Sequence, residues 1–202
     1  MNGKRRLGDY KEIEFVGGQP TKRIECAEKD SVLDKISTIP TKAITNGRLE
    51  KEFLYDLEYK VEFDSSKLTQ EGDVVLKLSS TYDATYITKE DEGLLVTSFC
   101  LILRVKDKTK LNPRFLNAFV NSDIYREQIK EMLSGAKVPM LTIEKVKDVF
   151  IKEFTMEEQE EIAGYYDNMR RHETIVNKII ELQKENLNVV LGGQCDECTS
   201  VL

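Results

Sequence analysis

Hydrophobic positions in the first two-thirds of the chain fall in short runs separated by turn-forming residues, a pattern that favours strands. The run 94–105 is apolar at both odd and even positions, which predicts a strand buried on both faces. The pattern therefore predicts a strand-rich centre, with strands over 13–16, 36–39, 74–78, 84–88 and 94–105.

Helix signals begin after this centre. Asn112 can cap a helix that has Pro113 at its first position. Ser122 can cap a second helix over 123–133, which Gly135 would end. The apolar residues of this second helix are expected on or near one face: Ile124, Ile129, Met132 and Leu133.

A short helix over 142–147 and a strand over 149–151 lead to the clearest element of the sequence, a long C-terminal helix. Thr155 and Glu158 have the spacing of a capping box, in which each side chain satisfies an amide left free at the helix start. Behind them, apolar residues recur every three or four positions, and nothing breaks the pattern before Gly192.

This helix of about 36 residues would be about 54 Å long at 1.5 Å per residue, longer than a domain of about 150 residues covers. Part of its apolar stripe is therefore expected to pack on another helix; the alternative is a helix lying wholly on its own domain. Buried polar residues in such a seam would specify its register. The residues predicted for the partner-helix seam are Ile162, Met169, His172, Val176, Ile179, Leu182 and Asn186.

These patterns predict an α+β chain in three parts. Residues 1–151 would form a mixed α/β domain with a strand-rich centre, and 152–191 one long coiled-coil helix that packs on a helix of another chain or another subunit. Residues 192–202 would form a disordered tail.

The charge is unevenly distributed. The chain has 202 residues, of which 40% are hydrophobic and 33% charged, with a net charge of −6. Residues 1–150 hold 25 basic and 25 acidic side chains, so the whole negative excess lies in 151–202. Because 101–147 holds ten basic and five acidic residues, the chain can present a basic face that binds polyanions. Chance scatter of charge is the alternative.

The sequence also indicates a cytoplasmic location with no membrane partner. No apolar run approaches eighteen residues, and no apolar core follows the basic N-terminal residues, as a secretory signal would require. The four cysteines of a chain without such a signal are expected to be reduced thiols.

Few residues could support catalysis. His172 is the only histidine, and the sequence has no P-loop, no GxGxxG and no nucleophile elbow. Cys195 and Cys198 have the spacing of half a zinc site or of a dithiol pair, but further ligands at a matching spacing are missing. We therefore predict a protein that is not an enzyme and that has no cofactor and no catalytic or metal-binding residues.

With catalysis set aside, three polar loops favour recognition of nucleic acid. The loops 17–23, 79–82 and 134–137 offer cations, hydroxyls and a phenol, which hold phosphate oxygens and read base edges. Each could instead be an ordinary solvated loop. The predicted DNA-binding residues are Gln19, Thr21, Lys22, Arg23, Lys77, Ser79, Ser80, Thr81, Tyr82, Arg104, Lys106, Ser134 and Lys137.

The order of these elements resembles the specificity subunit of type I restriction–modification systems. The resemblance is carried by LSGAKVPMLT at 133–142, VFI at 149–151 and EEQEEI at 157–162. It extends back through GDVVL at 72–76 to GGQP at 17–20 and LGD at 7–9. The usual proline-rich step before the long helix is replaced by 152–156, which alters how the chain enters the helix.

This resemblance implies a target recognition domain that binds double-stranded DNA without catalytic residues of its own. In that family methylation and cleavage lie in partner subunits, so the implied partners are a DNA methyltransferase subunit and the restriction subunit. A full subunit has two recognition domains and two antiparallel helices, whereas this sequence has one of each. Two copies would therefore rebuild the whole, each reading half of a split DNA site. A coiled-coil adaptor that binds protein only, and a metal or dithiol protein working through Cys195 and Cys198, remain alternatives.

Overall fold

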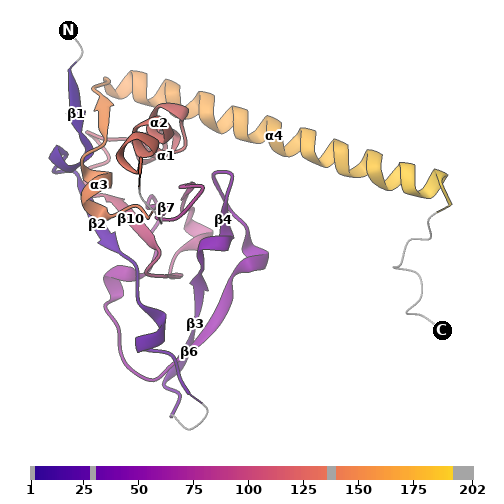
Figure 1. Ribbon diagram of the computed structural model, residues 1–202, viewed down its shortest axis with the longest axis horizontal. Coiled ribbons are helices and arrows are strands. Elements are labelled where there is room, and N and C mark those ends of the chain that lie inside the picture. Colours follow the sequence, from indigo (N-terminus) through magenta and orange to yellow (C-terminus); the bar gives the residue numbers. More distant parts are fainter. Residues whose placement is uncertain (1–2, 28–30, 136–139, 193–202) are drawn as a thin grey trace. The chain divides into compact units, whose positions relative to one another are not determined.

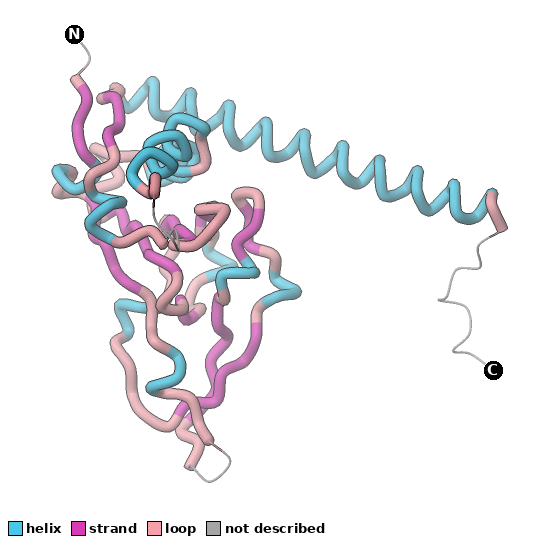
Figure 2. The backbone as a smooth tube through the Cα atoms, viewed as in Figure 1, coloured by secondary structure: helices cyan, strands magenta, loops and turns pink. Residues whose placement is uncertain are grey.

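The computed structural model describes residues 3–27, 31–135 and 140–192 (Figures 1 and 2). The chain forms two compact units, Met1–Ala163 and Gly164–Leu202. The boundary between the units falls inside the long C-terminal helix. No helix in the described part of the chain is both long and apolar enough to span a membrane.

The described residues of the first unit form four sheets. The central sheet is antiparallel, with the strand order β2-β10-β7-β8, and a second sheet has the order β6-β3-β9. Strands β1 and β11 form an antiparallel pair, as do β4 and β5. The strands are β1 (Lys4–Arg6), β2 (Ile13–Gly17), β3 (Asp34–Ile39), β4 (Ile44–Thr45), β5 (Arg48–Leu49), β6 (Tyr55–Tyr59), β7 (Val74–Lys77), β8 (Ala84–Tyr86), β9 (Leu95–Val96), β10 (Cys100–Val105) and β11 (Phe150–Lys152).

The central sheet is buried on both faces. Because successive side chains of a strand point to opposite sides, each strand contributes to two separate cores. Leu101 and Leu103 of β10 belong to the core that includes the helices, whereas Cys100 and Ile102 belong to a second core shared with β3 and β4. The burial predicted for this strand on both faces is therefore confirmed.

The predicted single strand over 94–105 is wrong in its extent. The segment forms two strands, β9 and β10, which lie in different sheets. Three residues, 97–99, separate them, and main-chain hydrogen bonds join this turn to Gln19, from Gln19 N to Val96 O (2.7 Å) and from Ser98 N to Gln19 O (2.9 Å). The apolar pattern of a sequence indicates which residues are buried, but it does not show where the chain passes from one sheet to another.

The helices begin where the capping residues predict. They are α1 (Pro113–Val120), α2 (Asp123–Met132), α3 (Ile143–Lys147) and α4 (Met156–Val190). The Asn112 side chain accepts a hydrogen bond from the Arg114 amide at 2.9 Å, and Ser122 caps α2. Gly135 has φ +80° shortly after α2 ends. The prediction for Ile124 is wrong: it is 66% exposed, and its neighbour Tyr125 is fully buried instead.

The capping box at the start of α4 is confirmed. The Thr155 amide donates to the Glu158 carboxylate at 2.8 Å, and the Glu158 amide donates to the Thr155 hydroxyl at 3.2 Å. The first turns belong to the first unit, where Gln159 and Ala163 are buried. Gln159 accepts from the Asn112 amide at 2.9 Å, which joins the start of α4 to the start of α1.

The part of α4 that belongs to the second unit is a single helix with an exposed apolar stripe. All its residues from Arg171 onward are exposed. They include Val176, Ile179 and Leu182, each about half exposed. Gly192 follows with φ +79°, and the predicted tail beyond it lies outside the described residues.

Candidate nucleic-acid interface

Two of the predicted loops leave the central sheet at the same end. Lys77 of β7 lies opposite Cys100 of β10, and Gly17 of β2 lies opposite Leu101. Beyond these pairs, the Leu78 amide donates to Phe99 O at 2.9 Å, and the Gly18 amide donates to Cys100 O at 3.1 Å. The loops that begin at Gly18 and Ser79 therefore start at the same end of the sheet, on either side of β10.

Residues Ser79–Tyr82 form the tight turn between β7 and β8. The Tyr82 amide donates to Ser79 O at 2.9 Å, and Tyr82 has φ +57°, a left-handed conformation that is uncommon outside glycine. Ser80 and Thr81 are exposed, whereas Ser79 and Tyr82 are half-buried, with Tyr82 packed against the core. Ser80 is thus the most accessible hydroxyl, because the Thr81 hydroxyl already donates to the Asp83 carboxylate.

The turn is fixed by a buried charge cluster beneath it. The Lys77 ammonium donates to Ile44 O at 3.0 Å and lies 3.8 Å from the Asp83 carboxylate, and both side chains are almost fully buried. Arg126 of α2 contacts the same carboxylate at 3.2 Å and is 41% exposed. Lys77 thus supports the turn from inside, and its burial argues against the predicted contact with DNA.

Arg104 is likewise used inside the fold. Its guanidinium donates to both carboxylate oxygens of Asp73, at 2.9 and 2.7 Å, and to the carbonyl oxygens of Ser66 and Leu68. Hydrogen bonding to Asp73 raises the pKa of Arg104 above its ordinary value. With each guanidinium nitrogen donating within the protein, Arg104 is poorly placed to bind a phosphate, contrary to the prediction.

Lys106 is exposed and lies 3.3 Å from the Glu14 carboxylate. It follows the C-terminal end of β10, whereas the Ser79–Tyr82 turn lies beyond the N-terminal end of that strand. The structure therefore does not bring Lys106 together with the turn.

The loop that contains Gln19–Arg23 turns toward the second sheet. Gln19 is 8% exposed and is held through its backbone, and this burial argues against the predicted contact of its side chain with bases. Thr21 makes a side-chain hydrogen bond with Tyr55 at the start of β6. Lys22 and Arg23 are exposed on this short 3-10 turn and remain available to an anionic partner.

The third predicted loop is only partly described. Ser134 and Gly135 are exposed, whereas Lys137 lies outside the described residues. The chain that follows returns to the same end of the central sheet, because the Leu141 amide donates to Leu78 O at 2.9 Å.

The sequence analysis missed a hairpin beside the turn. Strands β4 and β5 are joined by Asn46 and Gly47, which have φ +49° and +72°, and the pair packs against β8. Two positive φ values belong to a hairpin turn that favours Asn-Gly, so this dipeptide was the available signal. Phe99, which is 54% exposed in the turn before β10, was also missed. We refer to Ser79–Tyr82, 44–49 and 97–99 together as the turn cluster; Thr21–Arg23 lie instead beside the second sheet.

The predicted partner-helix residues divide between the two units. Ile162 is half-buried and packs against the core of the first unit. The others lie in the second unit, where His172 and Asn186 are exposed and the apolar members remain 46% to 52% exposed: Met169, Val176, Ile179 and Leu182.

The structure offers little support for a metal or thiol centre in the part that it describes. Across residues 3–27, 31–135 and 140–192, no three His, Cys, Asp or Glu side chains are grouped so that they could hold a metal ion. Burial raises the pKa of the Cys100 thiol to about 12, so it is a poor nucleophile. Cys195 and Cys198 lie outside the described residues.

Solved structures with the same fold come from type I restriction–modification systems. One neighbour is a chain in a structure that addresses complex assembly and conformational transition of the type I R-M system. It has a TM-score of 0.66 and 16% identity, over 99% of this chain and 51% of that one. The HsdS subunit from Thermoanaerobacter tengcongensis has a TM-score of 0.63 and 18% identity, over 99% and 51%. The S subunit from M. genitalium has a TM-score of 0.53 and 16% identity, over 91% and 42%.

No protein-family model matches the sequence, and no curated protein matches it. The chain spans about half the length of the solved chains that it matches. Its fold is that of a type I specificity subunit over this span, a strand-rich mixed domain followed by a long helix. The resemblance seen in the sequence is therefore confirmed at the level of the fold.

Proposed function

We propose that this protein is a sequence-specific DNA-recognition subunit of a type I restriction–modification complex. The observation that carries the proposal is the match of 99% of the chain to half of a solved HsdS subunit. In this role the chain binds double-stranded DNA in the cytoplasm and positions a methyltransferase subunit, with the restriction subunit as a further partner. It performs no bond chemistry and requires no cofactor of its own.

The turn cluster and the exposed turn Thr21–Arg23 are together the proposed DNA interface. Exposed cations at Lys22 and Arg23, with the half-exposed Arg126, would hold phosphates, because such contacts position a protein on the duplex. The exposed hydroxyl of Ser80 and the ring of Phe99 are the side chains best placed to meet base edges. The buried ion pair of Lys77 with Asp83 would keep the turn rigid beneath them.

Two copies of the chain are proposed to pair through α4 in antiparallel fashion. The motivation is the exposed stripe of Met169, Val176, Ile179 and Leu182, since apolar helix faces of this length are covered in stable proteins. His172 and Asn186 lie near the same seam and would fix its register. Each recognition domain, proposed as 1–151 with 152–191 as its spacer helix, then reads one half of a split site.

Selection from duplexes with random bases, followed by binding measurements over a range of salt concentrations, tests this function. A specificity subunit enriches a defined sequence, and its affinity falls as salt rises because counterions are released from the phosphates. Enrichment of no sequence, with binding as weak as that of an unrelated acidic protein, would favour the adaptor instead. Repeating the binding measurements with zinc or with a reductant tests the metal or dithiol alternative, because only a protein that works through its thiols would change its behaviour.

Sedimentation of the Ile179→Asp variant tests the pairing. A charge in the middle of the seam should give monomers, because it would have to be buried without a partner. A variant that stays dimeric excludes this stripe as the interface. Glu181→Ala, an exposed change on the same helix, serves as the control and should leave the oligomeric state unaltered.

A further inference from the structure

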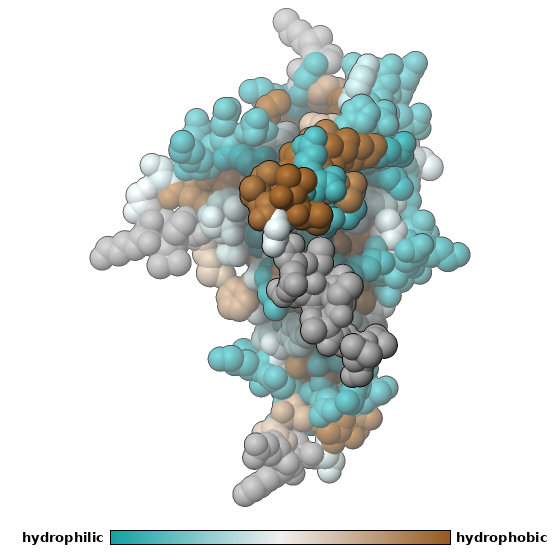
Figure 3. Space-filling view, turned by 90° about the vertical axis from the view of Figure 1, so that its right-hand side faces the viewer, coloured by the Kyte–Doolittle hydropathy of each residue, from teal (hydrophilic) through white to brown (hydrophobic). Residues whose placement is uncertain are grey.

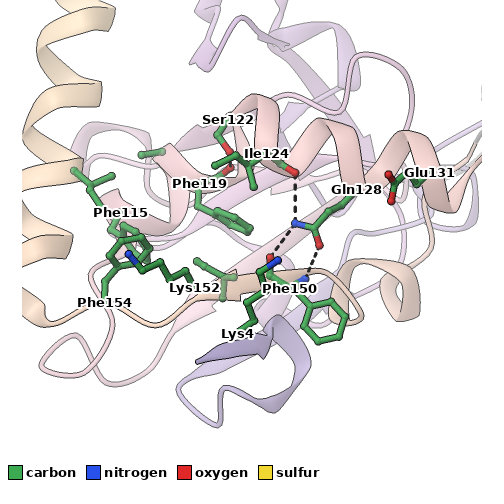
Figure 4. Close-up of a pocket in the computed structure, with 13 residues that line it drawn as sticks. Lys4, Phe115, Phe119, Ser122, Ile124, Gln128, Glu131, Phe150, Lys152 and Phe154 are labelled. Carbon is green, nitrogen blue, oxygen red and sulfur yellow. Dashed lines mark hydrogen bonds between the residues drawn. The ribbon is translucent and has the colours of Figure 1, made fainter. Parts of the chain in front are cut away.

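The first unit contains a large apolar pocket between α1, α2, β11 and the start of α4. Its volume is about 830 Å³, and its walls include Phe115, Phe119, Phe154 and Ile162 (Figure 4). The rings of Phe115 and Phe154 meet edge to face at 5.4 Å, so this wall is well packed. The pocket is therefore bounded by packed side chains of the first unit.

The rim of this pocket leaves apolar side chains exposed. Ile124 at the start of α2 is 66% exposed, and Phe150 in β11 is 47% exposed. Gln128 fixes the rim, because its side chain donates to Phe150 O at 2.9 Å and accepts from the Phe150 amide at 2.8 Å (Figure 4). The pattern places Ile124 on or near the apolar face of its helix, and its exposure is explained if another surface covers it.

The end of α4 carries apolar side chains that also lack a cover within the described residues. Leu187, Val189, Val190 and Leu191 are between 56% and 82% exposed. Figure 3 shows them as a hydrophobic cap on the end of α4 that faces the viewer. The last turn contains no basic residue, so the carbonyl groups at the negative end of the helix dipole are not neutralised locally.

Helix register relates the pocket to this cap. Ile162 and Val190 are equally far along α4 from Val176, in opposite directions, and all three share the seven-residue repeat of a coiled-coil stripe. In an antiparallel pair centred near Val176, the Val190 turn of one helix therefore lies opposite Ile162 of the other. Ile162 is part of the pocket wall.

We infer that the pocket receives the apolar end of α4, residues 187–191, from a second copy of this chain. This inference rests on the proposed antiparallel pairing and adds a second contact region beyond its seam. Charge is complementary as well, because the two cations Lys4 and Lys152 outnumber the single carboxylate, Glu131, in the pocket lining and favour the carbonyl end of a docked helix. Each dimer contains two such contacts by symmetry.

Dimer dissociation constants from sedimentation test the inference, with the variants Ile124→Glu and Val190→Glu. Both residues are exposed at helix ends, so the fold should survive, and circular dichroism checks this. Each change should weaken dimerisation roughly ten- to a hundredfold, the range for one apolar side chain withheld from an interface. The double variant should lose less than the product of the two effects, because the residues share one contact.

Val61→Glu is the matched control, since Val61 is 51% exposed and does not line the pocket. If the chain dimerises and Ile179→Asp abolishes the dimer, but either test variant behaves like Val61→Glu, the docking inference is overturned while the seam stands. A chain that is monomeric at every concentration overturns both. Multiplicative effects of the two substitutions would show that Ile124 and Val190 lie in separate contacts of the dimer, and would also overturn the inference.

Discussion

At the scale of single residues, the basic side chains of the first unit serve two different purposes. Lys77 and Arg104 stand at the ends of buried strands and have their charges satisfied by Asp83 and Asp73. Lys22 and Arg23 are exposed on a turn. The sequence predicted all four as DNA contacts, because it shows which residues carry charge but not which carboxylates the fold brings to them from distant positions.

The Arg104–Asp73 pair predicts a large effect of one substitution. Asp73→Asn removes the charge that offsets a guanidinium whose side chain is only 11% exposed. The free energy of unfolding should fall by about 3 kcal/mol or more, the usual cost of leaving a buried charge unpaired. Urea denaturation measures it, with Glu90→Gln as the control at an exposed ion pair. Equal stability of both variants would contradict a structural role for the pair.

Two exposed residues of the proposed DNA interface should affect DNA binding in different ways. Arg23→Ala should weaken binding to all sequences and lower the slope of log affinity against log salt by about one, as for the loss of one phosphate contact. Ser80→Ala should instead change which bases are preferred, with about 1–3 kcal/mol at stake for each base contact. Binding to selected and to scrambled duplexes separates the two effects. Lys106→Ala is the control, because Lys106 lies away from the turn.

At the scale of elements, the starts of helices were predictable and the pairing of strands was not. Asn112, Ser122 and Thr155 act on amides within three residues, so the local sequence contains the whole signal. The 94–105 segment divides between two sheets because of partners that are far away in the chain. The pocket could not be predicted for the same reason, since its walls come from five separate elements, β1, α1, α2, β11 and α4.

Two glycines with opposite surroundings should respond oppositely to alanine. A Cβ on Gly18 would lie 2.0 Å from Thr97 O, where backbone must shift, so Gly18→Ala should destabilise the protein by about 3 kcal/mol. A Cβ on Gly164 in α4 meets nothing within 4 Å, so Gly164→Ala should stabilise by about 0.5–1 kcal/mol. Chemical denaturation of both variants is the measurement. A tolerated Gly18→Ala would mean that the 97–99 turn is not held as described.

At the scale of the whole molecule, the uneven charge separates a neutral part, residues 1–150, from an acidic part, residues 151–202. The acidic excess lies in 151–202, where Glu157 and Glu158 stabilise the positive end of the α4 dipole. Residues 1–150, which contain most of the proposed recognition domain, carry no net charge that would repel DNA. The sequence could predict this division and the order of elements, but not the bases recognised, because base contacts depend on the detailed placement of the turn cluster.

The proposed dimer has a consequence for the DNA sequence that is recognised. Two identical domains related by a two-fold axis present identical surfaces in opposite directions, so the target should contain the same half-site twice, as an inverted repeat. The 35 residues of α4 make a helix about 52 Å long, roughly one and a half turns of duplex at about 34–36 Å per turn, which leaves an unread spacer between the half-sites. Lengthening that spacer by about half a turn places the half-sites on opposite faces of the duplex and should abolish high-affinity binding. Sequencing of selected duplexes, followed by titration of spacer variants, measures both features. A target with one half-site, or with two in the same orientation, would be incompatible with an antiparallel two-fold dimer.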